Sequence, residues 1–87
     1  MKEPAVTDST CLIGLERIGH LDLLPALFEP VIAPPEVQKE FGVSFSWLQI
    51  EAPSDKALVA ALKMLADDGE AEAIALASET RISNYLG

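Results

Sequence analysis

The chain has 87 residues, of which 49% are hydrophobic, and it carries fourteen Asp and Glu against six Lys and Arg, for a formal net charge of −8. This length suits one small domain, and the hydrophobic share is enough for a packed core, so a disordered tail is excluded. A chain this acidic has no evident basic face for a phosphate backbone. Any function on nucleic acid therefore needs positive charge from a divalent metal or from a partner.

Cys11 is the only cysteine, which excludes a disulfide framework and a thiolate metal site. We interpret it as a small buried apolar residue. No apolar run approaches membrane-spanning length, and the first residues do not resemble a signal peptide. The sequence therefore predicts a cytoplasmic protein with no membrane partner.

The first half of the chain alternates strand and helix patterns. It predicts, in order, a strand, two helices, a second strand and a third helix, at residues 4–8, 12–18, 20–28, 31–33 and 34–41. Ser9 or Thr10 is a suitable N-cap for the first helix, and Gly19 ends it. Asp8 therefore lies where a strand ends and a helix begins, beside the free amide groups of the helix N-terminus.

The second half continues the alternation. It predicts a short strand, a helix, an alanine-rich helix and the start of another strand, at residues 47–50, 57–65, 70–79 and 81–86. Ser54 is a suitable N-cap for the first of these helices, and residues 67–69 separate it from the second. Short strands that alternate with helices predict an α/β domain with a parallel sheet.

Three segments, in this order and at this spacing, carry a resemblance to a known family. They read VTDSTCLIGL, VIAPPEVQKEF and DDGEAEAIALA, at residues 6–15, 31–41 and 67–77. Together they resemble the PIN-domain family, and in particular its VapC-like prokaryotic branch. The resemblance covers nearly the whole chain. It implies a single three-layer α/β domain over residues 1–87, with a short parallel sheet flanked by helices.

The resemblance also implies a chemistry. In that family, acidic residues from separate elements converge at the carboxyl edge of the sheet and hold Mg²⁺ or Mn²⁺, which prefer oxygen ligands. The bound metal supports hydrolysis of phosphodiester bonds in RNA. By resemblance, the catalytic residues and metal ligands here are Asp8, Glu40 and Glu70. Glu72 is a nearby alternative to Glu70.

Members of the family normally continue into a further strand that carries another aspartate. This chain ends at Gly87, near the expected start of that strand, so the resemblance implies a domain truncated before its usual C-terminal strands and helix. Two functions are therefore open. One is a VapC-like, metal-dependent endoribonuclease of toxin type, with RNA as its substrate. The other is an inactive truncated module that forms a homo-oligomer or pairs with an antitoxin-like partner.

Each candidate residue also has a purely structural interpretation. Without the resemblance, Asp8 would be a turn residue or a helix cap. Glu40 would be a solvated helix residue, and Glu70 a carboxylate in the first turn of a helix, where acidic side chains are favourable. We interpret Trp47 as a core or interface residue and His20 as a turn residue.

Overall fold

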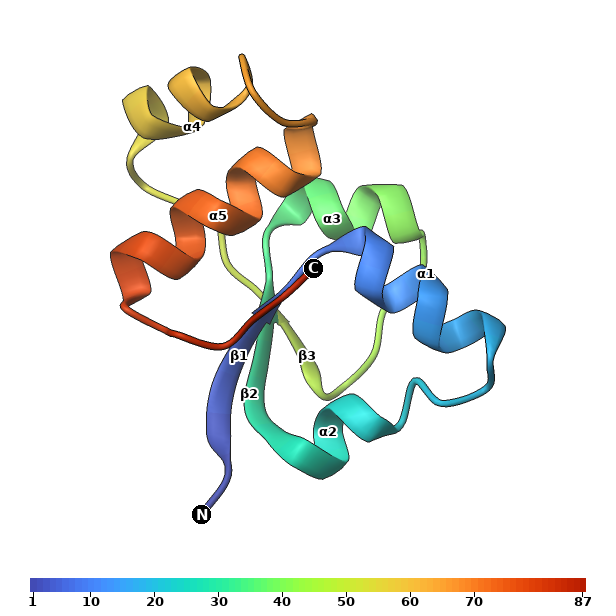
Figure 1. Cartoon of the computed structure of the whole chain (residues 1–87). Coiled ribbons are helices and arrows are strands. Elements are labelled where there is room, and N and C mark those ends of the chain that lie inside the picture. The colour runs from blue at the N-terminus through green and yellow to red at the C-terminus, as the bar shows by residue number, and fades with distance from the viewer.

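The structure, a computed structural model, describes residues 1–87 and consists of four short strands and five helices (Figure 1). The elements, in chain order, are β1 (Glu3–Thr7), α1 (Ser9–Arg17), α2 (Leu23–Leu27), β2 (Phe28–Ala33), α3 (Pro35–Phe41), β3 (Leu48–Ile50), α4 (Lys56–Leu62), α5 (Asp68–Thr80) and β4 (Tyr85–Leu86). Strands and helices alternate as the sequence predicts.

The four strands form one parallel sheet in the order β3-β2-β1-β4. The chain steps from β1 to β2 and then to β3, and it returns to the opposite side of β1 as β4. The direction of winding therefore reverses between β1 and β4. In open parallel sheets, ligands bind outside the carboxyl ends of the strands at such a reversal. The prediction of an α/β domain with a parallel sheet flanked by helices is confirmed, and a ligand site is expected at this point of the sheet.

The last strand is short but well anchored to β1. Val6 N–H donates to the Asn84 carbonyl at 2.9 Å, and Asp8 N–H donates to the Leu86 carbonyl at 3.2 Å. The Thr7 hydroxyl donates to the same Leu86 carbonyl at 3.1 Å. Figure 1 shows the C-terminal end of the chain beside the end of β1. β4 therefore contributes side chains to the same edge of the sheet as β1.

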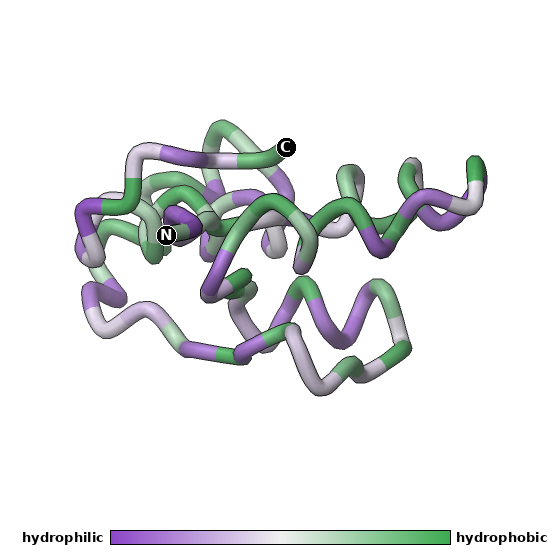
Figure 2. Tube along the Cα trace, turned by 90° about the horizontal axis from the view of Figure 1, so that it is seen from below, coloured by the Kyte–Doolittle hydropathy of each residue, from purple (hydrophilic) through white to green (hydrophobic).

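The core lies between the sheet and the helices that cover it. It consists of Val6, Leu12, Leu24, Val31, Ile32, Ala33, Val37, Leu48, Ala73 and Leu76. Hydrophobic and hydrophilic residues alternate along the helices, as amphipathic helices on a sheet require (Figure 2). Trp47 packs against this core and stacks on Phe45 with ring centroids 5.0 Å apart, which fits its predicted structural role. Among these helices, none has the length and apolar character needed to cross a bilayer.

Cys11 is half buried, with its side chain packed against the core, so the prediction of a small buried apolar residue holds only in part. The fold also corrects two predicted helix caps. Asp8 caps α1 and Asp55 caps α4, each through a side-chain oxygen that accepts a backbone N–H three residues later. The predicted caps were Ser9 or Thr10, and Ser54. Because all these residue types cap helices well, the sequence alone cannot choose between neighbours.

The second helix is shorter than predicted. α2 covers only five residues, and His20 lies exposed in the turn before it. Phe28, predicted as helical, instead begins β2 and pairs with Glu3 in the sheet. The hydrophobic spacing of this segment suits either structure, and pairing with β1 decides the outcome.

Candidate active site at the carboxyl edge of the sheet

Asp8 is the most buried acidic residue in the chain, with only 3% of its surface exposed. It follows β1 directly and precedes α1, at the point where the winding of the sheet reverses. Its Oδ1 accepts the Cys11 N–H at 3.1 Å, and its Oδ2 accepts the Tyr85 hydroxyl at 3.1 Å. Two donors on separate elements therefore fix the orientation of this carboxylate.

Tyr85 brings β4 into the site. Its half-buried ring places the hydroxyl against Asp8. Burial is the main cause that raises the pKa of the Tyr85 phenol, and the charges of Asp8, Glu70 and Asp67 add to it. The phenol therefore stays protonated and acts as a hydrogen-bond donor to Asp8. Three carboxylates, those of Asp8, Glu70 and Asp67, therefore act on this one phenol.

Glu40 reaches the same region from α3. Its side chain is exposed overall, but its carboxylate lies against Gly69 in the first turn of α5, with no room there for a Cβ atom. Partial burial raises the pKa of Glu40, and four neighbouring carboxylates raise it further. These belong, in order of effect, to Asp67, Glu36, Asp68 and Asp8. Repulsion among these groups is the kind of electrostatic environment that a bound cation relieves.

Glu70 lies in the first turn of α5, where its backbone N–H donates to Asp67 Oδ1 at 2.8 Å. Its side chain is exposed, and its charge contributes to the raised pKa of Tyr85. Glu40 contacts Gly69, the residue before Glu70, and Asp8 contacts Tyr85, so the three predicted residues belong to neighbouring elements of one region. The sequence alone assigned them to three separate elements, and the fold brings these elements together.

The donor set suits a hard divalent cation, since it offers only carboxylate and hydroxyl oxygens. With the side chains as they are placed, however, no three acidic, histidine or cysteine groups are close enough together to hold one ion. Asp8 is fixed by its hydrogen bonds, whereas Glu40 and Glu70 are exposed and can rotate. The assignment of these three residues as catalytic residues and metal ligands stays a prediction.

Glu72, the alternative to Glu70, lies elsewhere. It is half buried, and its Oε1 accepts the Glu36 N–H at 3.4 Å, at the start of α3. Glu36 and Glu72 both line a pocket that is formed with α4, so neither is simply a solvated surface charge. Glu70, whose charge acts on Tyr85 next to Asp8, therefore stays the predicted site residue of the two.

Three residues of this region were not selected from the sequence. Tyr85 carries no local signal, because its role depends on pairing between β4 and β1. Gly69 makes room for the Glu40 carboxylate, and the only sequence signal was its place in an acidic turn. Asp67 both caps α5 and lies near Glu40, which its position before an alanine-rich helix could have indicated.

Comparison with known proteins agrees with this geometry. No curated protein and no solved structure matches the chain. A family model described as PIN domain matches residues 4–86, which is nearly the whole chain. Proteins with this domain are generally nucleases. The order of the strands, the acidic edge and this match lead to one conclusion: the chain belongs to the PIN-domain family.

Proposed function

We propose that this protein is a metal-dependent endoribonuclease that hydrolyses phosphodiester bonds in single-stranded RNA with Mg²⁺ or Mn²⁺. Within the family, we assign it to the VapC-like toxins, which implies an antitoxin-like protein partner. The observation that carries the proposal is Asp8, a buried carboxylate at the point where the sheet reverses its winding.

The residues of this edge have separable tasks in the proposed reaction. Asp8 provides a ligand oxygen whose direction is set by the helix amide at Oδ1, so the carboxylate does not have to be ordered on binding. Glu40 and Glu70, from two different helices, would supply the further carboxylate oxygens that hold the ion. Tyr85 supplies a neutral donor next to Asp8. When bound, the divalent ion supplies a polarised water nucleophile and stabilises charge on the phosphate.

The first test is calorimetric titration of Mn²⁺ into the wild-type chain and into Asp8→Asn. Asparagine keeps the size of the side chain and an oxygen acceptor for the Cys11 N–H, so the fold should survive. Loss of a charged ligand should weaken Mn²⁺ binding by more than the roughly 10–100-fold that changes around a metal site usually cost. Cleavage of a single-stranded RNA should fall in parallel.

Asp22→Asn is the matched control, because Asp22 is exposed and makes no capping hydrogen bond. It removes the same charge far from the site and should leave Mn²⁺ binding and cleavage unchanged. Wild-type protein that is folded but binds no Mn²⁺, or cleavage that persists in Asp8→Asn, would exclude the proposed function.

A second candidate function rests on a different observation. Met64 and Leu65, in the turn that follows α4, expose 85% and 86% of their surface. Large adjacent apolar side chains at this exposure are typical of a surface that contacts another protein. The alternative is therefore an inactive module that acts by forming a homodimer or by binding an antitoxin-like partner through this turn.

Sedimentation velocity over a wide concentration range tests this alternative. The wild-type chain should associate as concentration rises, and a variant with Met64→Ser and Leu65→Ser should remain a monomer. Val43→Ser serves as the control, because it removes an exposed apolar side chain from a different part of the chain. A wild-type chain that stays monomeric throughout would argue against self-association through this surface.

A further inference from the structure

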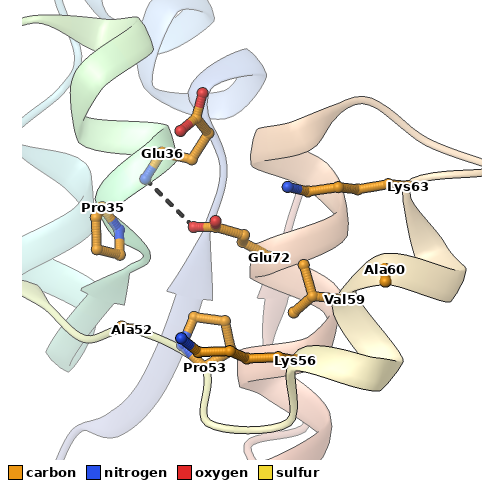
Figure 3. A pocket seen from close by; sticks show the side chains of 9 residues that line it. All are labelled: Pro35, Glu36, Ala52, Pro53, Lys56, Val59, Ala60, Lys63 and Glu72. Atoms are coloured by element: carbon orange, nitrogen blue, oxygen red, sulfur yellow. Dashed lines mark hydrogen bonds between the residues drawn. The ribbon is translucent and has the colours of Figure 1, made fainter.

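A pocket of about 410 Å³ lies between α3, α4 and α5 (Figure 3). Its lining combines two lysines, Lys56 and Lys63, with two glutamates, Glu36 and Glu72. Prolines, alanines and Val59 form the remainder of the wall. This volume falls in the range of small-molecule sites and is large enough for one nucleotide.

The two lysines come from one helix and its C-cap. They are seven residues apart, which is about two helical turns or roughly 10 Å along the axis, so they lie on the same side of α4. In Figure 3 both side chains extend from α4 across the pocket, with Glu72 between them. The whole chain has only six Lys and Arg, so a third of its basic side chains meet in this one pocket.

The two glutamates are placed as acceptors. The Glu36 N–H donates to Glu72 Oε1, and this is the one hydrogen bond among the residues that line the pocket in which a side chain takes part. The bond holds Glu72 in place, and because each carboxylate oxygen can accept two hydrogen bonds, both Oε1 and Oε2 remain able to accept from a ligand. Pro53 and Val59 provide apolar surface beside it. The pocket therefore offers ammonium donors, carboxylate acceptors and an apolar wall.

The pocket and the candidate active site share one edge of the sheet. Glu36 belongs to α3, which follows β2, and Pro53 follows β3, so the pocket lies outside the carboxyl ends of these strands. Asp8 lies at the carboxyl end of the neighbouring β1. The pocket and the candidate active site therefore lie outside neighbouring strands at the same edge of the sheet.

We propose that this pocket is a nucleotide-binding subsite for single-stranded RNA, selective for guanine, with Lys56 and Lys63 on the two flanking phosphates and Glu72 on the base. The inference rests on the proposed ribonuclease function and names the part of the substrate next to the cleaved bond. Among the four bases, guanine alone presents two adjacent N–H donors on its Watson–Crick edge, and these match a carboxylate. Unpaired RNA exposes this edge for recognition.

The charge balance supports the same occupant. In a chain of net charge −8, RNA must be held where basic side chains are concentrated, and each lysine that neutralises a phosphate adds affinity through counterion release. Two lysines about 10 Å apart on flexible stems can reach successive phosphates on either side of one nucleotide. The apolar wall at Val59 then packs against the base.

The test is fluorescence anisotropy of labelled single-stranded RNA in EDTA, so that binding is measured without cleavage. Two oligonucleotides, one with guanines and one with uridines only, are titrated with the wild-type chain and with Lys56→Gln/Lys63→Gln. The double variant should bind about 10-fold more weakly, and the slope of log K against log salt should fall by about 1.4, since each phosphate contact on a single strand contributes about 0.7. Both lysines are exposed, so the fold should tolerate the change.

The matched control is Lys2→Gln/Arg17→Gln, which removes the same charge. Lys2 precedes β1, and Arg17 ends α1, so both lie away from the carboxyl edge. Glu72→Gln tests the base contact, because its oxygen can still accept the Glu36 N–H. It should lower the preference for guanine over uridine by 5-fold or more, as expected for loss of a bidentate base contact.

The inference is wrong if the lysine variant binds RNA as tightly as the control variant, or if Glu72→Gln leaves the ratio of the two affinities unchanged. Its failure is distinguishable from failure of the proposed function. Asp8-dependent cleavage with unchanged RNA binding in the lysine variant would overturn only the subsite. Lysine-dependent, guanine-selective RNA binding by a chain that binds no Mn²⁺ would support the subsite and overturn the nuclease.

Discussion

Gly69→Ala should separate the stability of this protein from its proposed metal binding. Gly69 is the second residue of α5, and its backbone has ordinary helical geometry. A methyl group at this position would overlap the Glu40 carboxylate, whereas its next contact, with Val37 Cγ2 at 3.5 Å, is an ordinary one. The glycine is therefore required for the position of Glu40 rather than for a special backbone conformation.

Two opposing effects determine the stability of the variant. Alanine stabilises a helix relative to glycine by about 0.5–1 kcal/mol, and less in the first turn. Against this, the Glu40 side chain must rotate away, which costs little because it is exposed and flexible. Rotation also takes its carboxylate away from Asp67 and the other acidic groups that raise its pKa. We expect an unchanged or slightly raised melting temperature, by at most about 4–8 °C per kcal/mol gained.

Metal binding should respond in the opposite direction. If Glu40 is a ligand, its displacement removes one charged oxygen donor, and Mn²⁺ affinity should fall by about 10-fold or more, as changes around metal sites do. Thermal unfolding and calorimetric Mn²⁺ titration on the same preparation measure both effects. Gly14→Ala is the matched control, because Gly14 lies in α1 with no atom near the added methyl. It should stabilise the fold without changing Mn²⁺ affinity.

Either of two results would refute this reasoning. Unchanged Mn²⁺ affinity in folded Gly69→Ala would show that Glu40 does not need this position or is not a ligand. A melting temperature lowered by several degrees would show that α5 or α3 must move, so that Glu40 is not the flexible partner of the contact.

Two further predictions follow from hydrogen bonds of carboxylates. Tyr85→Phe removes the hydrogen bond to Asp8 Oδ2 and leaves the bond from the Cys11 N–H to Oδ1. Because Oδ2 is then free to bind the ion, Mn²⁺ affinity should rise several-fold in the same titration. Weaker Mn²⁺ binding would show instead that the phenol positions Asp8. The pKa of Glu79 lies below 4.5, mainly because the backbone and hydroxyl of Ser54 donate to it. The contribution of the ionised Glu79 to the free energy of unfolding is thus complete above about pH 4.5, and it is lost as the pH falls through the lower pKa of the folded state. Glu79→Gln should reduce that loss in thermal unfolding at acid pH, and an unchanged pH profile would contradict the assignment.

Local patterns in the sequence were enough to predict most of the fold. The opening strand that ends just before Asp8, the helix after Pro34 and the αL glycine at Gly42 all follow from turn chemistry and hydrophobic spacing within a few residues. The errors fall where two local solutions are nearly equal in energy. Phe28 suits a helix or a strand, and only its pairing with Glu3 in the sheet selects the strand.

The candidate site was predictable only in part, because its parts come from distant places in the sequence. The contact between Glu40 and Gly69 depends on how α3 packs against α5, and no pattern within either helix reports it. The contact between Tyr85 and Asp8 depends on the return of the chain to the free side of β1. Such long-range pairings are decided by the whole topology, whereas caps and turns are decided locally.

Asp8 shows that the structural and the functional interpretation of a residue need not compete. As an N-cap it accepts the Cys11 N–H through Oδ1, and this same bond fixes the carboxylate at the edge of the sheet. Burial to 3% exposure removes the water that would otherwise solvate the charge, so the carboxylate gains from a nearby cation more than an exposed one would. In the proposed function, the bonds that make Asp8 a helix cap would therefore also orient it for a metal, and its remaining oxygen lone pairs would be shared between Tyr85 and the ion.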